Sequence, residues 1–186
     1  MSLRDFKEEF HVKDRTLYAV ICISHELKWE IQSPVNHMLK RIETELEGEL
    51  EHYQEVQTAY VYESPLLEVR EFQAMEKNSP FIYKEPCVGK YHNLPHIFFM
   101  GMVLLQELQK NNKEGEYRLY LVTDEKFHQS QVRQIVYEQG NEIRLSSVFE
   151  DLDFKPVLFK TAGAGGDILE TYFEKNKNGE VRLFSS

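Results

Sequence analysis

The residues best suited to chemistry follow an apolar run in the second half of the chain. Residues 117–122 read Tyr-Arg-Leu-Tyr-Leu-Val, which is the pattern of a β-strand, and Thr-Asp-Glu follows at 123–125. Open α/β sheets bind their ligands at the carboxyl ends of strands, where a strand passes into a helix. A carboxylate there can bind a cation, accept a proton or contact a partner, so Asp124 and Glu125 are candidate site residues.

A second apolar run, residues 15–24, ends in the same manner. It is a continuous stretch of β-forming residues, typical of a strand that is buried on both faces. Ser24, His25 and Glu26 end the run with a hydroxyl, an imidazole and a carboxylate. His25 and Glu26 form an acid/base cluster with Asp124 if the fold brings them together. The alternative is that they are solvent-facing loop residues that cap helices.

Two other motifs have chemical interpretations. His92 and His96 are four residues apart, as in helical zinc pairs, but Pro95 starts the next helix and leaves His92 outside it, beside Asn93 as the cap. The glycine-rich residues 163–166 lack the Gly-Lys-Ser/Thr ending of a phosphate-binding loop. We therefore expect a helix cap and a flexible turn at these places, with His92 and Asn93 contributing to a candidate interaction face.

Composition and charge limit the classes of protein that fit. The chain has 186 residues, of which 41% are hydrophobic, so residues 1–186 are expected to form a single domain, with 1–14 as an N-terminal arm. A net charge of -9 argues against nucleic acid or an anionic membrane as the main partner. The first residues lack an apolar signal core, and no apolar stretch approaches the roughly 18 residues of a membrane span, so we expect a cytoplasmic protein. Cys22 and Cys87 have neither metal-ligand nor redox spacing, and both are expected to be reduced.

Strand and helix periodicities alternate along the chain. The predicted strands are 15–24, 57–62, 67–72, 117–122, 142–148, 155–160 and 180–184, and the predicted helices are 27–53, 94–110, 130–139 and 167–175. The first helix has glutamates at alternate positions from 43 to 51, which we expect to face solvent. The order predicts a three-layer α/β/α sandwich with a mostly parallel central sheet and one antiparallel edge strand.

This order resembles the von Willebrand factor A family over roughly residues 15–175. Residues 57–64, Gln-Thr-Ala-Tyr-Val-Tyr-Glu-Ser, resemble the first strand of that family's hairpin, with its aromatic-x-Ser ending. Residues 89–95 and the helix after them match a family loop and its helix, and Leu-Val-Thr-Asp-Glu at 121–125 resembles the family's strand that ends in Thr-Asp-Gly. The resemblance implies that the strands before residues 25 and 124 are neighbours.

The metal site of the family is incomplete here. Its Asp-x-Ser-x-Ser loop supplies a carboxylate and hydroxyls to a cation, but residues 24–28 read Ser-His-Glu-Leu-Lys. The family's loop threonine has no clear counterpart, because His92 and Asn93 occupy that neighbourhood. Ser24, Glu26 and Asp124 are the remaining candidates for a metal ion such as Mg²⁺, and the expectation is that the chain has no cofactor.

Two functions remain open. The first is a non-enzymatic protein-interaction module, in which the face built from residues 24–28, 86–95 and 124–128 binds a protein partner without metal. The second is a metal-dependent or acid/base hydrolase that uses a His/Glu/Asp cluster at the same face. The sequence does not decide whether the protein is an enzyme, and it is compatible with a homo-oligomer.

Overall fold

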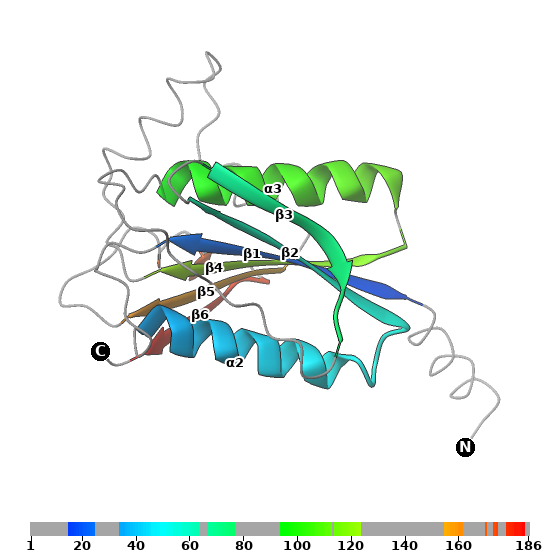
Figure 1. The fold of residues 1–186 in the computed structure, drawn as a ribbon, viewed down its shortest axis with the longest axis horizontal. Coiled ribbons are helices and arrows are strands. Elements are labelled where there is room, and N and C mark those ends of the chain that lie inside the picture. The colour runs from blue at the N-terminus through cyan, green and yellow to red at the C-terminus, as the bar shows by residue number, and fades with distance from the viewer. Residues whose placement is uncertain are drawn as a thin grey trace, which may run out of the picture.

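A six-stranded sheet runs through the computed structural model of this chain (Figure 1). The structure describes residues 15–24, 34–63, 67–76, 94–112, 114–123, 155–161, 170, 173–174 and 178–184. The strands are, in chain order, β1 (Thr16–Ser24), β2 (Glu55–Glu63), β3 (Leu67–Ala74), β4 (Glu116–Thr123), β5 (Lys155–Thr161) and β6 (Glu180–Phe184). Across the sheet they lie in the order β3-β2-β1-β4-β5-β6.

All neighbouring strands are parallel except β2 and β3 at one edge. Only three residues separate β2 from β3, which is too few for a parallel crossover, so this pair must be antiparallel. The pairing register shifts between Thr58 and Tyr60, where the hairpin has an irregularity. β6 forms the opposite edge and pairs parallel with β5. The predicted mixed sheet with one antiparallel edge strand is confirmed.

Two helices cover opposite faces of the sheet, α2 (Pro34–Glu49) on one side and α3 (Leu94–Asn111) on the other (Figure 1). Successive strand side chains point to opposite faces, so β1 contributes to two separate cores. Cys22 lies in a cluster with Met102 of α3, whereas Ile21 and Ile23 lie with Met38 of α2. This arrangement explains why β1 is apolar at nearly every position, and it confirms the three-layer sandwich.

The predicted first helix is too long at its carboxyl end. Residues 27–53 were expected to be helical, but α2 ends at Glu49, and the N–H groups of His52 and Tyr53 both bond to the Glu49 carbonyl. The Gln54 N–H then donates to the carbonyl of Arg15 at 3.0 Å. The chain must leave the helix here to begin β2 beside β1, so strand pairing overrides the helical pattern.

The expectation that the glutamates of α2 face solvent is wrong for part of the row. Glu43 is only 8% exposed, and the Tyr60 hydroxyl donates a hydrogen bond to its Oε1 at 3.4 Å. Glu45 and Glu49 are half-buried and form ion pairs with arginines of the sheet. The alternating sequence did not show this, because it does not indicate how far the sheet extends beneath the helix.

Only one of the remaining predicted elements can be compared with the structure. Residues 170 and 173–174 are helical, in agreement with the predicted last helix. The predicted helix at 130–139, the predicted strand at 142–148 and the glycine-rich turn at 163–166 lie outside the described residues. So do the N-terminal arm at 1–14 and Cys87.

Candidate functional site

The carboxyl ends of β1, β4 and β5 lie side by side at one end of the sheet, which we call the carboxyl edge. The end at which these strands begin is the amino edge. β1 and β4 pair up to their last residues, with Ser24 beside Thr123, and β4 and β5 pair up to Thr123 and Lys160. From β1 the sheet continues to β2 on one side, and from β4 it continues to β5 on the other. The strand order therefore reverses between β1 and β4, and open α/β sheets bind ligands in the crevice at such a reversal.

Ser24, Thr123 and Lys160 form a row of polar side chains across β1, β4 and β5, which we call the polar row. Residues in parallel register lie on the same face, about 4.8 Å apart from strand to strand. Cys22, Leu121 and Leu158, two residues earlier in each strand, all lie in the cluster beneath α3, so the polar row is on the α3 face. All three side chains are buried, with exposed fractions of 1%, 0% and 2%.

Lys160 carries a charge in this buried position. Its Nζ lies 3.2 Å from Oε1 of Glu170, and the lysine side chain is 3% exposed while the glutamate side chain is 25% exposed. Removing an ammonium group from water costs several kcal/mol unless an anion and hydrogen bonds compensate. Glu170 provides that compensation, so the ion pair holds the lysine at the sheet edge.

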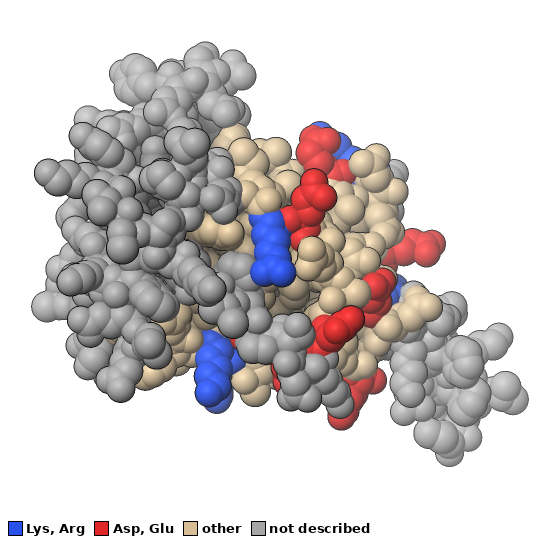
Figure 2. Space-filling model, viewed as in Figure 1, with Lys and Arg blue, Asp and Glu red and all other residues tan. Residues whose placement is uncertain are grey.

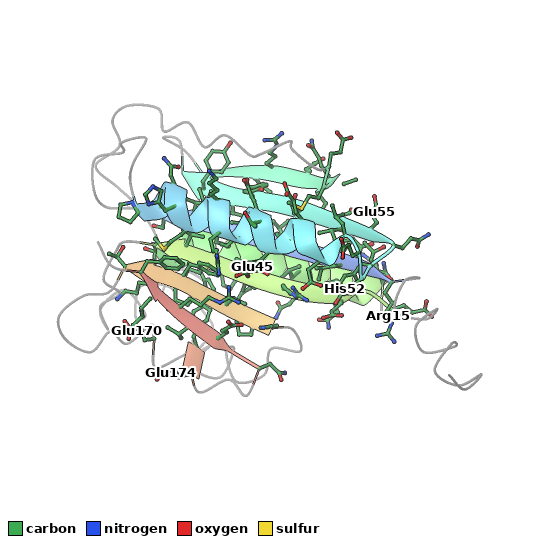
Figure 3. The ribbon with its side chains drawn as sticks, turned by 90° about the horizontal axis from the view of Figure 1, so that it is seen from below. Arg15, Glu45, His52, Glu55, Glu170 and Glu174 are labelled. Carbon is green, nitrogen blue, oxygen red and sulfur yellow. The ribbon has the colours of Figure 1, made fainter. Side chains whose placement is uncertain are left out.

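A packing contact anchors the segment that supplies Glu170. Phe173 follows it by three residues and is fully buried, and its ring centroid lies 5.6 Å from that of Phe98 on α3. Figure 3 shows Glu170 and Glu174 toward the carboxyl edge, whereas Arg15, His52 and Glu55 lie toward the amino edge. The apolar anchor and the ion pair together place one carboxylate beside the polar row.

The polar row brings two hydroxyl groups and an ammonium group together beneath this edge of the sheet, and all three side chains are buried there. The Glu170 carboxylate beside the row is already paired with the Lys160 ammonium, so it is a poor ligand for a divalent cation. Within the described residues, no group of three or more His, Cys, Asp or Glu side chains is arranged to hold a metal ion.

Of the residues predicted for the site, only Ser24 can be placed. It ends β1 and is buried beside Thr123. The other candidates lie outside the described residues: His25, Glu26, His92, Asn93, Asp124 and Glu125. The metal candidates Glu26 and Asp124 are among them, so the weak metal site stays a prediction.

Sequence reasoning missed Lys160 as a site residue and treated it only as the end of a strand. The available signal was its place in Val-Leu-Phe-Lys, where it continues an apolar run that is buried on both faces. Cys22 was expected to be reduced, and it is a free thiol in the structure. It is fully buried, and desolvation raises the pKa of its thiol.

Among the described helices, none has both the length and the apolar character needed to cross a bilayer. Comparison with known proteins gives no assignment, since no protein-family model matches this chain and no curated protein matches it.

Proposed function

We propose that this chain is a protein-interaction module on a von Willebrand A-like scaffold, and that its recognition surface is the carboxyl edge of the sheet around β1 and β4. The partner binds without a metal ion. The resemblance in sequence motivates the scaffold, and the adjacency of β1 and β4, which that resemblance implies, supports it.

One observation carries the proposal. The polar row lies at the point where the strand order reverses, which is the ligand-binding position of this class of sheet. The residues two positions earlier on the same face, Cys22, Leu121 and Leu158, are apolar, so a change to polar side chains in all three strands at once needs a reason. Shaping the recognition edge and holding the segments that leave it is such a reason.

The charge at this edge favours contact with protein over binding of a metal. Lys160 places a positive charge one strand away from Thr123, the residue before Asp124. Glu170 pairs with the Lys160 ammonium, so its carboxylate is already engaged and is a poor ligand for a divalent cation, whereas a protein partner needs no carboxylate at this position.

The charge away from the carboxyl edge favours a protein partner over nucleic acid. Acidic side chains gather toward the amino edge on the face shown in Figure 2. Together with the net charge of -9, they would repel a phosphate backbone.

A matched pair of charge reversals tests the proposal. Asp124→Arg changes the residue after β4, and Glu51→Arg makes the same change at an exposed position in the turn after α2. Each variant and the parent chain are crosslinked in an extract of the cells that naturally make the protein, and the proteins captured by each are then compared. We expect one captured protein to be lost with Asp124→Arg and retained with Glu51→Arg.

A thermal-shift series tests the proposal that this chain acts without a metal ion. Mg²⁺, Mn²⁺, Ca²⁺ and Zn²⁺ are each expected to leave the Tm unchanged, because a ligand raises the Tm only if it binds the native state. A Tm that rises with metal concentration, and no longer rises in Asp124→Ala, would contradict the proposal. Capture of the same proteins by both charge-reversal variants would also contradict it.

A further inference from the structure

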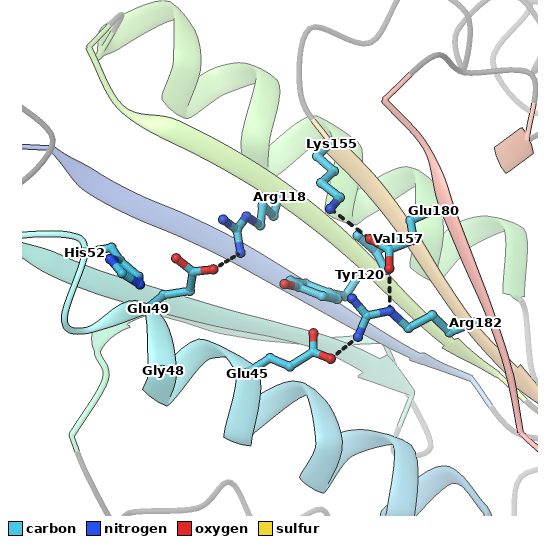
Figure 4. Close-up of a pocket in the computed structure, with 10 residues that line it drawn as sticks. All are labelled: Glu45, Gly48, Glu49, His52, Arg118, Tyr120, Lys155, Val157, Glu180 and Arg182. Carbon is cyan, nitrogen blue, oxygen red and sulfur yellow. Dashed lines mark hydrogen bonds and ion pairs between the residues drawn. The ribbon is translucent and has the colours of Figure 1, made fainter.

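A hollow of about 420 Å³ opens at the opposite, amino edge of the sheet (Figure 4). Its walls are the last turns of α2 and the first residues of β4, β5 and β6, so it is separate from the polar row and independent of the function proposed above. Its volume lies in the range of about 300 to 1,000 Å³ that small-molecule sites occupy.

The hollow is lined by equal numbers of positive and negative side chains. On the positive side, Arg118, Lys155 and Arg182 come from three neighbouring strands. On the negative side, Glu45 and Glu49 come from α2 and Glu180 comes from β6. The six side chains have no net charge together.

These charges are paired across the hollow. Arg118 lies 3.0 Å from Glu49, and Lys155 lies 2.8 Å from Glu180. Arg182 bridges the strand and the helix, because it binds Glu180 on β6 and a second carboxylate on α2 (Figure 4). A ligand with one sign of charge would therefore meet as many like charges as opposite ones.

Two of the cations keep hydrogen-bonding capacity. Nε of Arg118 is buried and has no hydrogen-bond partner in the part of the chain that the structure describes. The Lys155 ammonium has three N–H groups, and Glu180 is its one ion-pair partner among the described residues. The lysine side chain is 44% exposed, so a ligand that brings acceptor oxygens can reach it.

Gly48 leaves the helix wall of the hollow open. It lies within α2, and a Cβ built on it would meet no atom within 4 Å. Its φ is not in the positive range that favours glycine. Glycine destabilises a helix relative to alanine, and neither packing nor backbone conformation requires it here. Close approach of a ligand to the backbone of α2 is a reason for a glycine at this position.

We propose that this hollow binds a small zwitterion of the amino-acid class. Its carboxylate is held by the cations of β4 and β5, and its ammonium is held by the glutamates that face them. A zwitterion uses both signs of charge in the lining, and the site stays neutral when it is occupied.

The test is a thermal-shift series with the standard L-amino acids, each at about 20 mM, together with the N-acetyl and amide forms of any that respond. A ligand at ten times its Kd should raise the Tm of a chain of this size by about 3 to 6 °C. We expect the zwitterion to produce this rise and each singly charged form to lose most of it.

Two substitutions on α2 locate the site. Gly48→Ala should raise the Tm of the ligand-free protein through helix propensity and reduce the rise that the amino acid produces, and the larger Gly48→Leu should abolish that rise. Thr44→Ala is the matched control, because Thr44 is exposed on α2 and does not line the hollow. It should raise the ligand-free Tm and leave the response to the amino acid intact.

Three results would overturn the proposal. The first is that no amino acid raises the Tm. The second is that the N-acetyl or amide forms act as strongly as the zwitterion. The third is that Gly48→Leu, although folded, keeps the full response, which would show general solute stabilisation.

Discussion

Gly101 sets how closely α3 approaches the sheet. A Cβ built at this position would lie 2.3 Å from Sγ of Cys22, 3.1 Å from Cδ1 of Leu119 and 3.3 Å from Cγ1 of Val20. Cys22 is fully buried in a central strand that pairs on both sides, so its sulfur has no room to retreat. Gly101→Ala should therefore destabilise the protein, although alanine is the better helix former.

The magnitude follows from two opposing effects. Alanine in place of a helical glycine gains about 1 kcal/mol in helix propensity. Overpacking of a core costs about 1 to 3 kcal/mol, and a contact of 2.3 Å with a fixed atom should be at the upper end. The net loss should be about 1 to 2 kcal/mol, which lowers the Tm by about 2 to 8 °C for a chain of this length.

Cys22→Ala isolates the cause. It removes the sulfur, at a cost of about 1 kcal/mol for lost burial, and leaves room for the new methyl group. In that background Gly101→Ala should be neutral or stabilising by up to about 1 kcal/mol. A double-mutant cycle by urea unfolding should therefore give a coupling free energy of about 1 to 3 kcal/mol. A coupling below about 0.5 kcal/mol would refute the reasoning and assign the loss to Leu119 and Val20 instead.

Three further outcomes are expected. Glu170→Ala should cost about 2 to 3 kcal/mol in urea unfolding because it removes the carboxylate that pairs with the buried ammonium of Lys160. Lys160→Met should cost less than about 1 kcal/mol, and equal losses would contradict this account of the pair. Tyr60→Phe should cost about 1 kcal/mol at neutral pH, since it removes the hydrogen bond to the buried Glu43, and an unchanged urea midpoint would count against that bond. Burial, and then the nearby Glu43, raise the pKa of Tyr60 above its ordinary value of about 10, so the folded state keeps a proton that the unfolded state loses. The stabilisation from the protonated Tyr60 hydroxyl is present below about pH 10 and is lost as the pH rises. Between pH 10 and 11 the unfolding free energy of Tyr60→Phe should therefore fall less steeply than that of the parent, by up to about 1.4 kcal/mol per pH unit. Parallel slopes for the two proteins would refute this.

Local patterns predicted most of the described elements. β1, β4 and β5 were recognisable because parallel strands buried on both faces need apolar residues at nearly every position. The helix at 94–110 was predicted almost to the residue, since α3 ends at Asn111. The end of α2 was wrong, because a pairing of Gln54 with Arg15, far away in the sequence, ends the helix.

The candidate site was predicted less completely than the fold. Ser24 was recognised because it ends an apolar run. Lys160 was not, because its burial depends on Glu170 and on a register with Thr123 that no local pattern contains. The same is true of the hollow at the amino edge, whose lining comes from α2 and three strands spread over more than half of the chain.

The sequence by itself determined the kind of domain. Alternating apolar periods and a short hairpin connection are consequences of local geometry, and they are sufficient to predict a layered α/β sheet with an antiparallel edge strand. Only the tertiary structure decided which side chains meet. Strand order and register bring Ser24, Thr123 and Lys160 into one row, and they bring the glutamates of α2 over the cations of β4, β5 and β6. The physical reason is that side-chain contacts between strands depend on pairings across long stretches of chain, whereas composition and periodicity report only on neighbours in sequence.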